Sequence, residues 1–280
     1  MKTFIKVFLI IGFAGIGLGL ILLIPVISNG FTLKDVPTYS FEESFDGIES
    51  LDINIDFGDV AIVRGNEFRV EADHLFESIE FTAEADNGVL TIRDDVDEAI
   101  NLFDFQIPTV FVLGDRLEPE ITITVPEDFV ADDIYFELSA GRLQADDIRS
   151  KTGSFIVSAG EIVINHLEVS GESDYRIGIG HMKLEQLDAK DITVDCGIGD
   201  IDIEGTIIGE NYISCGIGSV RLDLDGDEDD YSYEIDSNIG KFAINGDNYH
   251  NNRYDRNADG NGLGSFTMDC GIGNITLDIK

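Results

Sequence analysis

The chain has 280 residues, of which 55 are acidic and 18 basic, so its formal net charge is −37 at pH 7. Every acidic residue lies after residue 30, and the part beyond that point carries 55 acidic and 16 basic residues, a charge of −39. Such a charge excludes nucleic acid as a partner and disfavours anionic lipid surfaces. It favours cationic peptides, basic proteins or divalent cations, although acidic side chains also simply keep a long β protein soluble.

The N-terminus predicts a membrane anchor. Residues 1–6 carry Lys2 and Lys6, and residues 7–27 form an uncharged stretch long enough to cross a bilayer as a helix. Positive charge before this stretch predicts that residues 1–6 are cytoplasmic and that, after a linker at residues 28–40, the acidic remainder is extracytoplasmic. A cleaved signal peptide is the alternative, although its apolar region is usually shorter. Gly15 and Gly19 form a G-x-x-x-G pair, through which two such helices could form a homo-oligomer.

Residues 41–135 predict irregular β structure. Short alternating runs occur at 68–72, 79–83, 89–92 and 121–125, and Gly58 stands within an apolar pattern that returns later in the chain. Between Asp94 and Pro119 the alternation is lost, which indicates a loop. We interpret the whole region as a cap on the more regular structure that follows.

Residues 136–280 contain a repeat built around glycine. Sequences such as Phe155-Ile-Val-Ser-Ala-Gly160 and Val194-Asp-Cys-Gly-Ile-Gly199 recur seven times, and the glycines are spaced by 19, 20, 19, 19, 22 and 33 residues. The repeat glycines are Gly141, Gly160, Gly180, Gly199, Gly218, Gly240 and Gly273. A period of 19 to 20 residues is typical of stacked rungs, so we expect an all-β solenoid resembling a single-stranded β-helix, with parallel rungs.

Each repeat predicts two strand arms that meet at the glycine. Apolar residues lie three and one positions before it and two and four positions after it, so the inward phase changes there. Both arms can face the core only if the chain bends, and glycine tolerates the backbone angles of a bend. The glycines are therefore expected to form a structural file along one corner of the stack.

The repeat, the N-terminal anchor and the strand ending in Thr124-Val-Pro126 together resemble the bacterial putative-adhesin family of β-repeat domains, also called toastrack domains. The resemblance covers about residues 40–280. It implies a β-solenoid on the outer face of a bacterial membrane, often associated with envelope-stress signalling, and it implies no catalytic residues.

Three cysteines occupy the same repeat position, three residues before the glycine: Cys196, Cys215 and Cys270. Two of them should therefore lie on adjacent rungs, about 4.8 Å apart, which is wider at Cβ than a disulfide prefers. We expect a buried, reduced stack in the core.

The 33-residue step contains a polar insertion at residues 245–265 with a candidate calcium loop. Its sequence offers alternating oxygen ligands followed by Gly260, as in the first half of an EF-hand loop, at Asp255, Asn257, Asp259 and Asn261. Phe266 stands where the closing glutamate belongs, so an ordinary polar loop is the alternative. A second acidic cluster, interpreted as solvated or weakly cation-binding, comprises Asp223, Asp225, Asp227, Glu228, Asp229 and Asp230.

The sequence thus predicts a single-pass protein of the bacterial cell membrane whose extracytoplasmic solenoid acts as a non-catalytic module for envelope interaction, adhesion or stress sensing. Its partner would be an envelope protein, a cationic peptide or a glycan. One alternative is a calcium-dependent adhesive scaffold. Another is a polysaccharide-acting enzyme with exposed carboxylates such as Asp200 and Asp202, but the chain has no tryptophan platform for sugar and no residue pair suited to nucleophile and base.

Overall fold

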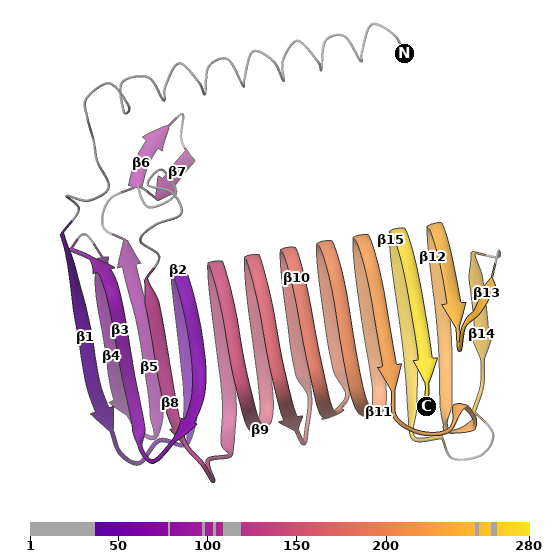
Figure 1. Ribbon diagram of the computed structural model, residues 1–280, viewed down its shortest axis with the longest axis horizontal. Coiled ribbons are helices and arrows are strands. Elements are labelled where there is room, and N and C mark those ends of the chain that lie inside the picture. Colours follow the sequence, from indigo (N-terminus) through magenta and orange to yellow (C-terminus); the bar gives the residue numbers. More distant parts are fainter. Residues whose placement is uncertain are drawn as a thin grey trace, which may run out of the picture.

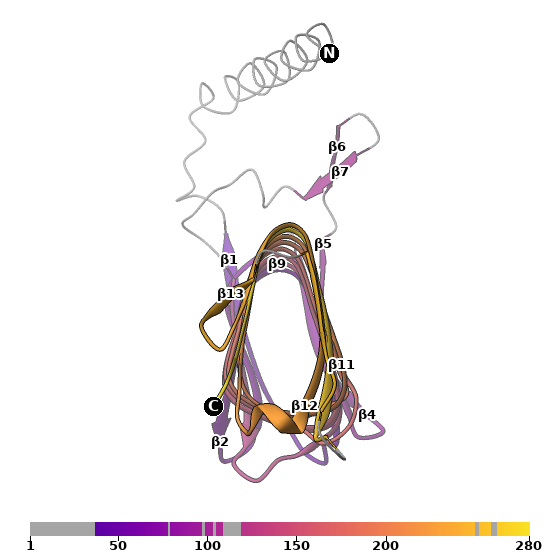
Figure 2. The same ribbon diagram turned by 90° about the vertical axis from the view of Figure 1, so that its right-hand side faces the viewer.

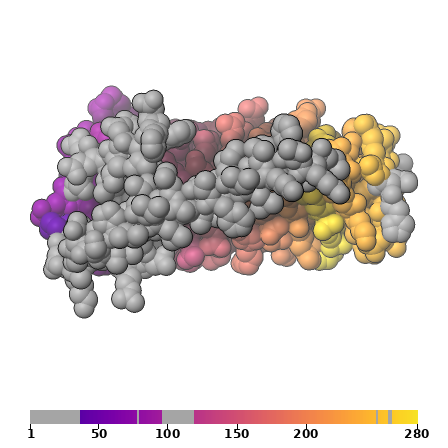
Figure 3. All heavy atoms as spheres, turned by 90° about the horizontal axis from the view of Figure 1, so that it is seen from above, coloured from indigo at the N-terminus to yellow at the C-terminus, as the bar shows by residue number. Residues whose placement is uncertain are grey.

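The computed structural model describes residues 37–77, 79–96, 99–102, 105–108, 119–249, 252–258 and 262–280. The N-terminal segment predicted to be an anchor lies outside these residues. Among the described residues, no helix has the length and apolar character needed to cross a bilayer. Figure 1 shows a single long row of strands, and Figure 3 shows from above that the molecule is elongated along the direction of stacking.

The described residues are almost entirely β structure. The N-terminal elements are β1 (Thr38–Phe45), β2 (Ser50–Gly65), β3 (Phe68–Phe76), β4 (Ile79–Asp86), β5 (Val89–Val96), β6 (Ala99–Leu102), β7 (Phe105–Pro108) and β8 (Glu120–Pro126). The C-terminal elements are β9 (Ala131–Val169), β10 (Ser173–Lys190), β11 (Ile192–Leu224), the short 3-10 helix η3 (Glu228–Asp230), β12 (Tyr231–Ile244), β13 (Asp247–Tyr249), β14 (Arg253–Arg256) and β15 (Gly264–Ile279).

The repeats form parallel rungs in strict register, as the 19- to 20-residue period predicts. Strand β9 contributes two successive rungs, β10 one and β11 two, and each long strand continues through the bend rather than ending there. Gly180 lies opposite both Gly160 and Gly199, and Gly273 lies opposite Gly218 and Gly240. The predicted all-β architecture of stacked parallel rungs is confirmed, and in Figure 2 the rungs superimpose as one flattened closed outline.

The order of the rungs differs from the order of the chain. The main sheet runs β1-β3-β8-β2-β9-β10-β11-β15-β12-β13, so the last strand of the protein lies between β11 and β12. Strand β15 pairs in parallel with both neighbours, and yellow β15 is visible between two orange rungs in Figure 1. The insertion at residues 245–265 therefore carries the chain back from the end of the stack to this inner place.

The core is a continuous apolar column between the two arms. On the arm before the bend, residues five and three positions before the glycine are buried, such as Phe155 and Val157, and on the other arm Ile162 and Ile164 are buried. Equivalent side chains stack from rung to rung, as Phe155 does on Tyr175 with ring centroids 5.6 Å apart. A single rung could not bury this surface alone, and stacking is what stabilises it.

The bend is tightly packed against the neighbouring rung. Six of the seven repeat glycines have φ between +138° and +151°, a region that side-chain-bearing residues rarely adopt. The backbone of the bend is packed against the glycine of the preceding rung: a Cβ on Gly160 would lie 1.8 Å from the oxygen of Gly141. The expectation that the residue just before the glycine faces inward is wrong for most rungs, because the chain turns at this point and leaves the side chain outside; Ile179, for example, is 59% exposed.

At the N-terminal end of the stack, β5 and β8 pair in parallel with β2, and antiparallel strands follow beyond them. Strand β2 forms a rung against β9 in the same register, with Gly58 opposite Gly141. Strands β1, β3 and β8 continue the sheet beyond it, and β4 pairs with β5. The predicted loop between Asp94 and Pro119 is wrong in part, because β6 and β7 pair there as a separate antiparallel hairpin.

The other end is covered by aromatic side chains. The short strands β13 and β14 pair antiparallel with β12, the terminal rung. Tyr249 and Tyr254 from these strands contact each other at 4.9 Å between ring centroids and pack against Phe242 of the rung. The repeat sequence also departs from its pattern here, with Ser237 and Asn238 in place of cysteine and glycine. That departure marks the rung that ends the stack.

Candidate functional site

The residues proposed for calcium are only partly described. Asp255 lies within β14, is 61% exposed at its side chain, and its Oδ1 lies 3.5 Å from Nε of Arg253. Asn257 follows the strand, whereas Asp259 and Asn261 lie outside the described residues. Calcium binding by this insertion stays a prediction.

Glu228 of the second acidic cluster connects elements of the end cap through hydrogen bonds and an ion pair. Glu228 accepts hydrogen bonds from the hydroxyl of Tyr233 and from Nδ2 of Asn245, and it forms an ion pair with Arg256 at 2.8 Å. Asp223 forms an ion pair with Arg221 at 3.1 Å. These carboxylates therefore have partners within the protein.

The cysteines lie in one buried row, as expected. Cys215 and Cys270 are direct neighbours across β11 and β15, and Cys196 lies one rung earlier. All three are free thiols; Cys215 donates to the carbonyl of Gly199 at 3.6 Å, and Cys270 makes the same contact one rung on. Burial raises the pKa of Cys215 and of Cys270 to about 11, so both remain protonated donors at neutral pH.

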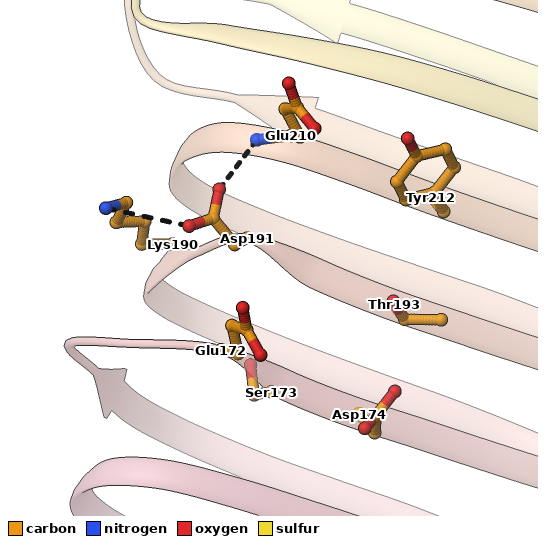
Figure 4. A pocket seen from close by; sticks show the side chains of 8 residues that line it. All are labelled: Glu172, Ser173, Asp174, Lys190, Asp191, Thr193, Glu210 and Tyr212. Carbon is orange, nitrogen blue, oxygen red and sulfur yellow. Dashed lines mark hydrogen bonds and ion pairs between the residues drawn. The ribbon is translucent and has the colours of Figure 1, made fainter.

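A groove on the outer side of three successive rungs is a concave surface that carries charge. It has a volume of 560 Å³ and lies where the chain turns from one rung into the next (Figure 4). Eight residues from the start of β10 to the middle of β11 line it: Glu172, Ser173, Asp174, Lys190, Asp191, Thr193, Glu210 and Tyr212. With four carboxylates and one ammonium group, its formal charge is −3.

The turns between rungs set the geometry of this groove. Asp191 adopts a left-handed conformation with φ of +53°, and its Oδ1 accepts a hydrogen bond from the backbone of Glu210 at 2.8 Å. Behind the groove, the buried side chain of Asn211 accepts from the backbone of Ile192 at 3.0 Å and donates to the carbonyl of Ser265. These contacts join the turns at Asp191 and Glu210, and the backbone N–H of Ser173 donates to the carbonyl of Asp191 at 3.4 Å, which joins the first turn to them. The groove is therefore preorganised rather than formed by loose loops.

One cation inside the groove leaves most of its negative charge uncompensated. Nζ of Lys190 lies 3.6 Å from Asp191, whereas the other three carboxylates point toward the open space (Figure 4). Arg176, which does not line the groove, approaches Asp174 loosely at 3.9 Å. The half-exposed ring of Tyr212 offers an apolar and aromatic wall beside the carboxylates. Such a surface suits an extended segment that carries lysine or arginine side chains, with the ring available for cation–π contact.

The residues of the groove were not predicted from the sequence, although a signal was present. Glu172, Asp191 and Glu210 are separated by steps of 19 residues, the period of the repeat, and therefore form a row of acidic residues. Asp174 and Tyr212 lie two residues after the first and last of these. Periodicity finds the row, but it does not show that the row borders a concavity.

Comparison with known proteins identifies the family. The Toastrack DUF4097 family matches residues 48–277. The chain belongs to this family. Similar solved structures include a putative cell adhesion protein from Clostridium sporogenes, with 15% identity and a TM-score of 0.33 over 87% of this chain and 100% of that one. A putative adhesin from Bacteroides fragilis has 14% identity and a TM-score of 0.33 over 87% and 97%. No curated protein matches the chain.

A charge network joins the first rungs of this toastrack domain. Asp147 accepts from Nε of Arg64 at 2.9 Å, forms an ion pair with Arg149 at 2.8 Å and contacts Nδ1 of His166 at 2.5 Å. Burial opposes ionisation of Asp147, but the hydrogen bond to His166 and the two guanidinium charges outweigh it and lower its pKa. The part of the toastrack chain that the structure describes contains no group of three or more His, Cys, Asp or Glu side chains placed to hold a metal ion.

Proposed function

We propose that the protein is a non-catalytic interaction module of the bacterial envelope, held at the membrane by residues 7–27, whose acidic groove binds a cationic peptide or a basic segment of an envelope protein. The groove carries this proposal, because it combines concavity, a formal charge of −3 and an exposed aromatic wall. The charge of −39 on the part of the chain after residue 30 raises the local concentration of cationic partners and speeds their association.

The solenoid suits binding more than chemistry. Its exposed side chains stand on a hydrogen-bonded scaffold of paired strands, and the groove lies across three rungs whose turns are hydrogen-bonded together. The ionisable cluster around Asp147 includes two guanidinium groups that pair with the carboxylate, and it joins the first rungs. Partner recognition by fixed charges on such a scaffold needs no catalytic group.

The groove can be tested with matched charge variants. The full chain, reconstituted in phosphatidylcholine nanodiscs, would be titrated with an oligolysine peptide, and D174N/E210Q should weaken binding by about fivefold, as expected for two lost charge contacts. The control E80Q/E84Q removes two exposed charges from β4 at the other end and should leave the affinity unchanged. Equal weakening by both variants would mean diffuse attraction and would overturn the groove assignment.

The anchor requires a separate test. Protease added outside intact cells should remove the acidic domain, while a tag placed before Lys2 should remain protected inside. A soluble mature protein that begins near Asn29 would show that residues 7–27 are a cleaved signal and would contradict membrane anchoring.

A further inference from the structure

An apolar ridge runs along the bend edge, which is the edge defined by the file of glycines. Its members occupy the position just before the glycine in five consecutive rungs and are between 47% and 66% exposed. They are, in order along the stack, Ile179, Ile198, Ile217, Ile272 and Ile239. Four spacings of about 4.8 Å give this isoleucine ridge a length of roughly 19 Å.

The two residues that directly flank each isoleucine of the ridge are uncharged. Four of its isoleucines stand between two glycines, and the fifth, Ile239, stands between Asn238 and Gly240. These fifteen edge residues include no ionisable group, although 26% of the whole chain is charged. The glycines beside the isoleucines have no side chain that could cover them, and the isoleucines remain about half exposed. An exposed apolar strip in so acidic a protein indicates a contact surface.

The described chain begins at this same edge. Thr38 at the start of β1 lies opposite Phe76, and three residues earlier Asp73 lies opposite Glu120. Glu120 in turn lies opposite Asp59, the residue after the bend glycine of β2. Figure 1 shows the start of β1 at the upper edge, over which the long strands arch. The link from residues 7–27 to the folded domain therefore reaches it at the edge that carries the ridge.

The distances favour a membrane as the occupant of the ridge. Residues 28–36 comprise nine residues and extend to at most about 30 Å, so an anchor at residues 7–27 holds the bend edge near the bilayer. The ridge lies in the half of the stack away from β1, from β10 to β12, and so provides a second point of contact. A second copy is a weaker fit, since five half-exposed isoleucines offer on the order of 500 Å² against about 800 Å² per partner in a stable dimer.

We infer that the isoleucine ridge rests in the interfacial region of the lipid bilayer and that the solenoid lies with its long axis along the membrane. This inference rests on the proposed membrane anchor. Isoleucine side chains at this depth bury apolar surface, and the residues that directly flank them carry no charge that would have to be desolvated. In this orientation the acidic groove, which lies on an arm near the opposite turns, stays open to partners.

Because the chain contains no tryptophan, a single introduced tryptophan can report its own depth. The full chain with I217W would be reconstituted into phosphatidylcholine vesicles with and without brominated acyl chains. The matched control is Y212W, which lies on the same rung, is 53% exposed and belongs to the groove face. Bromolipid should quench I217W several-fold more strongly than Y212W, and the emission of I217W should shift to shorter wavelength.

The outcomes separate this inference from the anchor itself. Vesicle flotation shows whether the chain is anchored, so failure to float would contradict the proposed function. Flotation with equal, weak quenching of I217W and Y212W would overturn the ridge inference alone. The inference would also be overturned if the emission of I217W shifted to shorter wavelength as the density of protein in the vesicles increased, without being quenched by bromolipid. That result would assign the ridge to contacts between copies of the chain.

Discussion

The carbonyl oxygen of Gly180 lies 1.7 Å from the position that a Cβ atom on Gly199 would occupy. Because the clash is with backbone of a paired strand, it cannot be relieved by rotating a side chain. The same contact recurs along the stack, which explains why the repeat keeps glycine at the bend.

We therefore expect G199A to lower the free energy of unfolding by more than about 2 kcal/mol, since it combines an unfavourable φ with overpacking. The control is G246A, because Gly246 has φ of +84° and no atom lies within 4 Å of the position that its Cβ would occupy. That variant should cost only about 1 kcal/mol, the conformational part alone. Denaturant melts of both variants measure the difference, and equal losses would contradict tight packing at the bend.

The raised pKa of Asp94 predicts that the protein loses stability as pH rises. Burial, together with the charge of Asp56, raises its pKa to about 6, although backbone hydrogen bonds from Asp56 and Phe57 act in the other direction. A carboxyl whose folded pKa is raised stabilises the protein most below the unfolded pKa near 4, and this contribution disappears as pH rises through 6. D94N should therefore raise the melting temperature at pH 8 and leave it unchanged at pH 4.5. D95N, at the exposed adjacent position, should show no such pH dependence.

Asp147 predicts the opposite pH dependence. Its lowered pKa means that its contribution is present above the ordinary carboxyl pKa and is lost as pH falls through the folded value. D147N should lower the melting temperature at pH 7, because the side chain of Arg64, which is only 9% exposed, would lose its charged partner. The difference in melting temperature between D147N and wild type should become smaller in acid. The control D146N changes an exposed carboxylate that accepts only from Asn165 among the described contacts. A similar loss in both variants would argue against the network.

The calcium hypothesis makes its own prediction. Binding to the folded state alone would raise the melting temperature in millimolar calcium, and D255A/D259A should abolish the rise, whereas magnesium should substitute poorly. A calcium effect that survives the double substitution would place the ion elsewhere. If calcium does not change the melting temperature of the wild-type chain, the insertion binds no calcium and serves as a linker to β15.

The sequence predicted the parts of the fold that depend on periodic local constraints. The glycine spacing indicated the rung, the bend and the shared row of Cys196, Cys215 and Cys270, because one backbone geometry is repeated with one set of inward side chains. The exposure of Ile217 was not predicted, because alternation alone places its side chain on the same face as that of Cys215. Only the three-dimensional structure shows that the side chain at this position faces outward.

Rung order could not be predicted either. Cys215 and Cys270 belong to nearly identical segments, and any two segments with matching inward side chains can pair, so local pattern carries little information about which rung follows which. The replacement of cysteine and glycine by Ser237 and Asn238 did indicate the terminal rung, because a terminal rung pairs with another repeat on one side only. The groove required three-dimensional information, since its acidic row is periodic but its concavity is not.

The position of β15 has a consequence for how the protein is made. A chain synthesised from its N-terminus delivers β12 before β15, yet β12 makes its parallel contacts with β15 and not with β11. The native pairing at the β11 edge can therefore form only after residues 264–279 have been synthesised, and any earlier pairing of β12 with β11 has to be exchanged. A chain cut short before residue 264 lacks the native partner of that edge, which is then open to aggregation. The rungs thus cannot be completed in the order in which they are made.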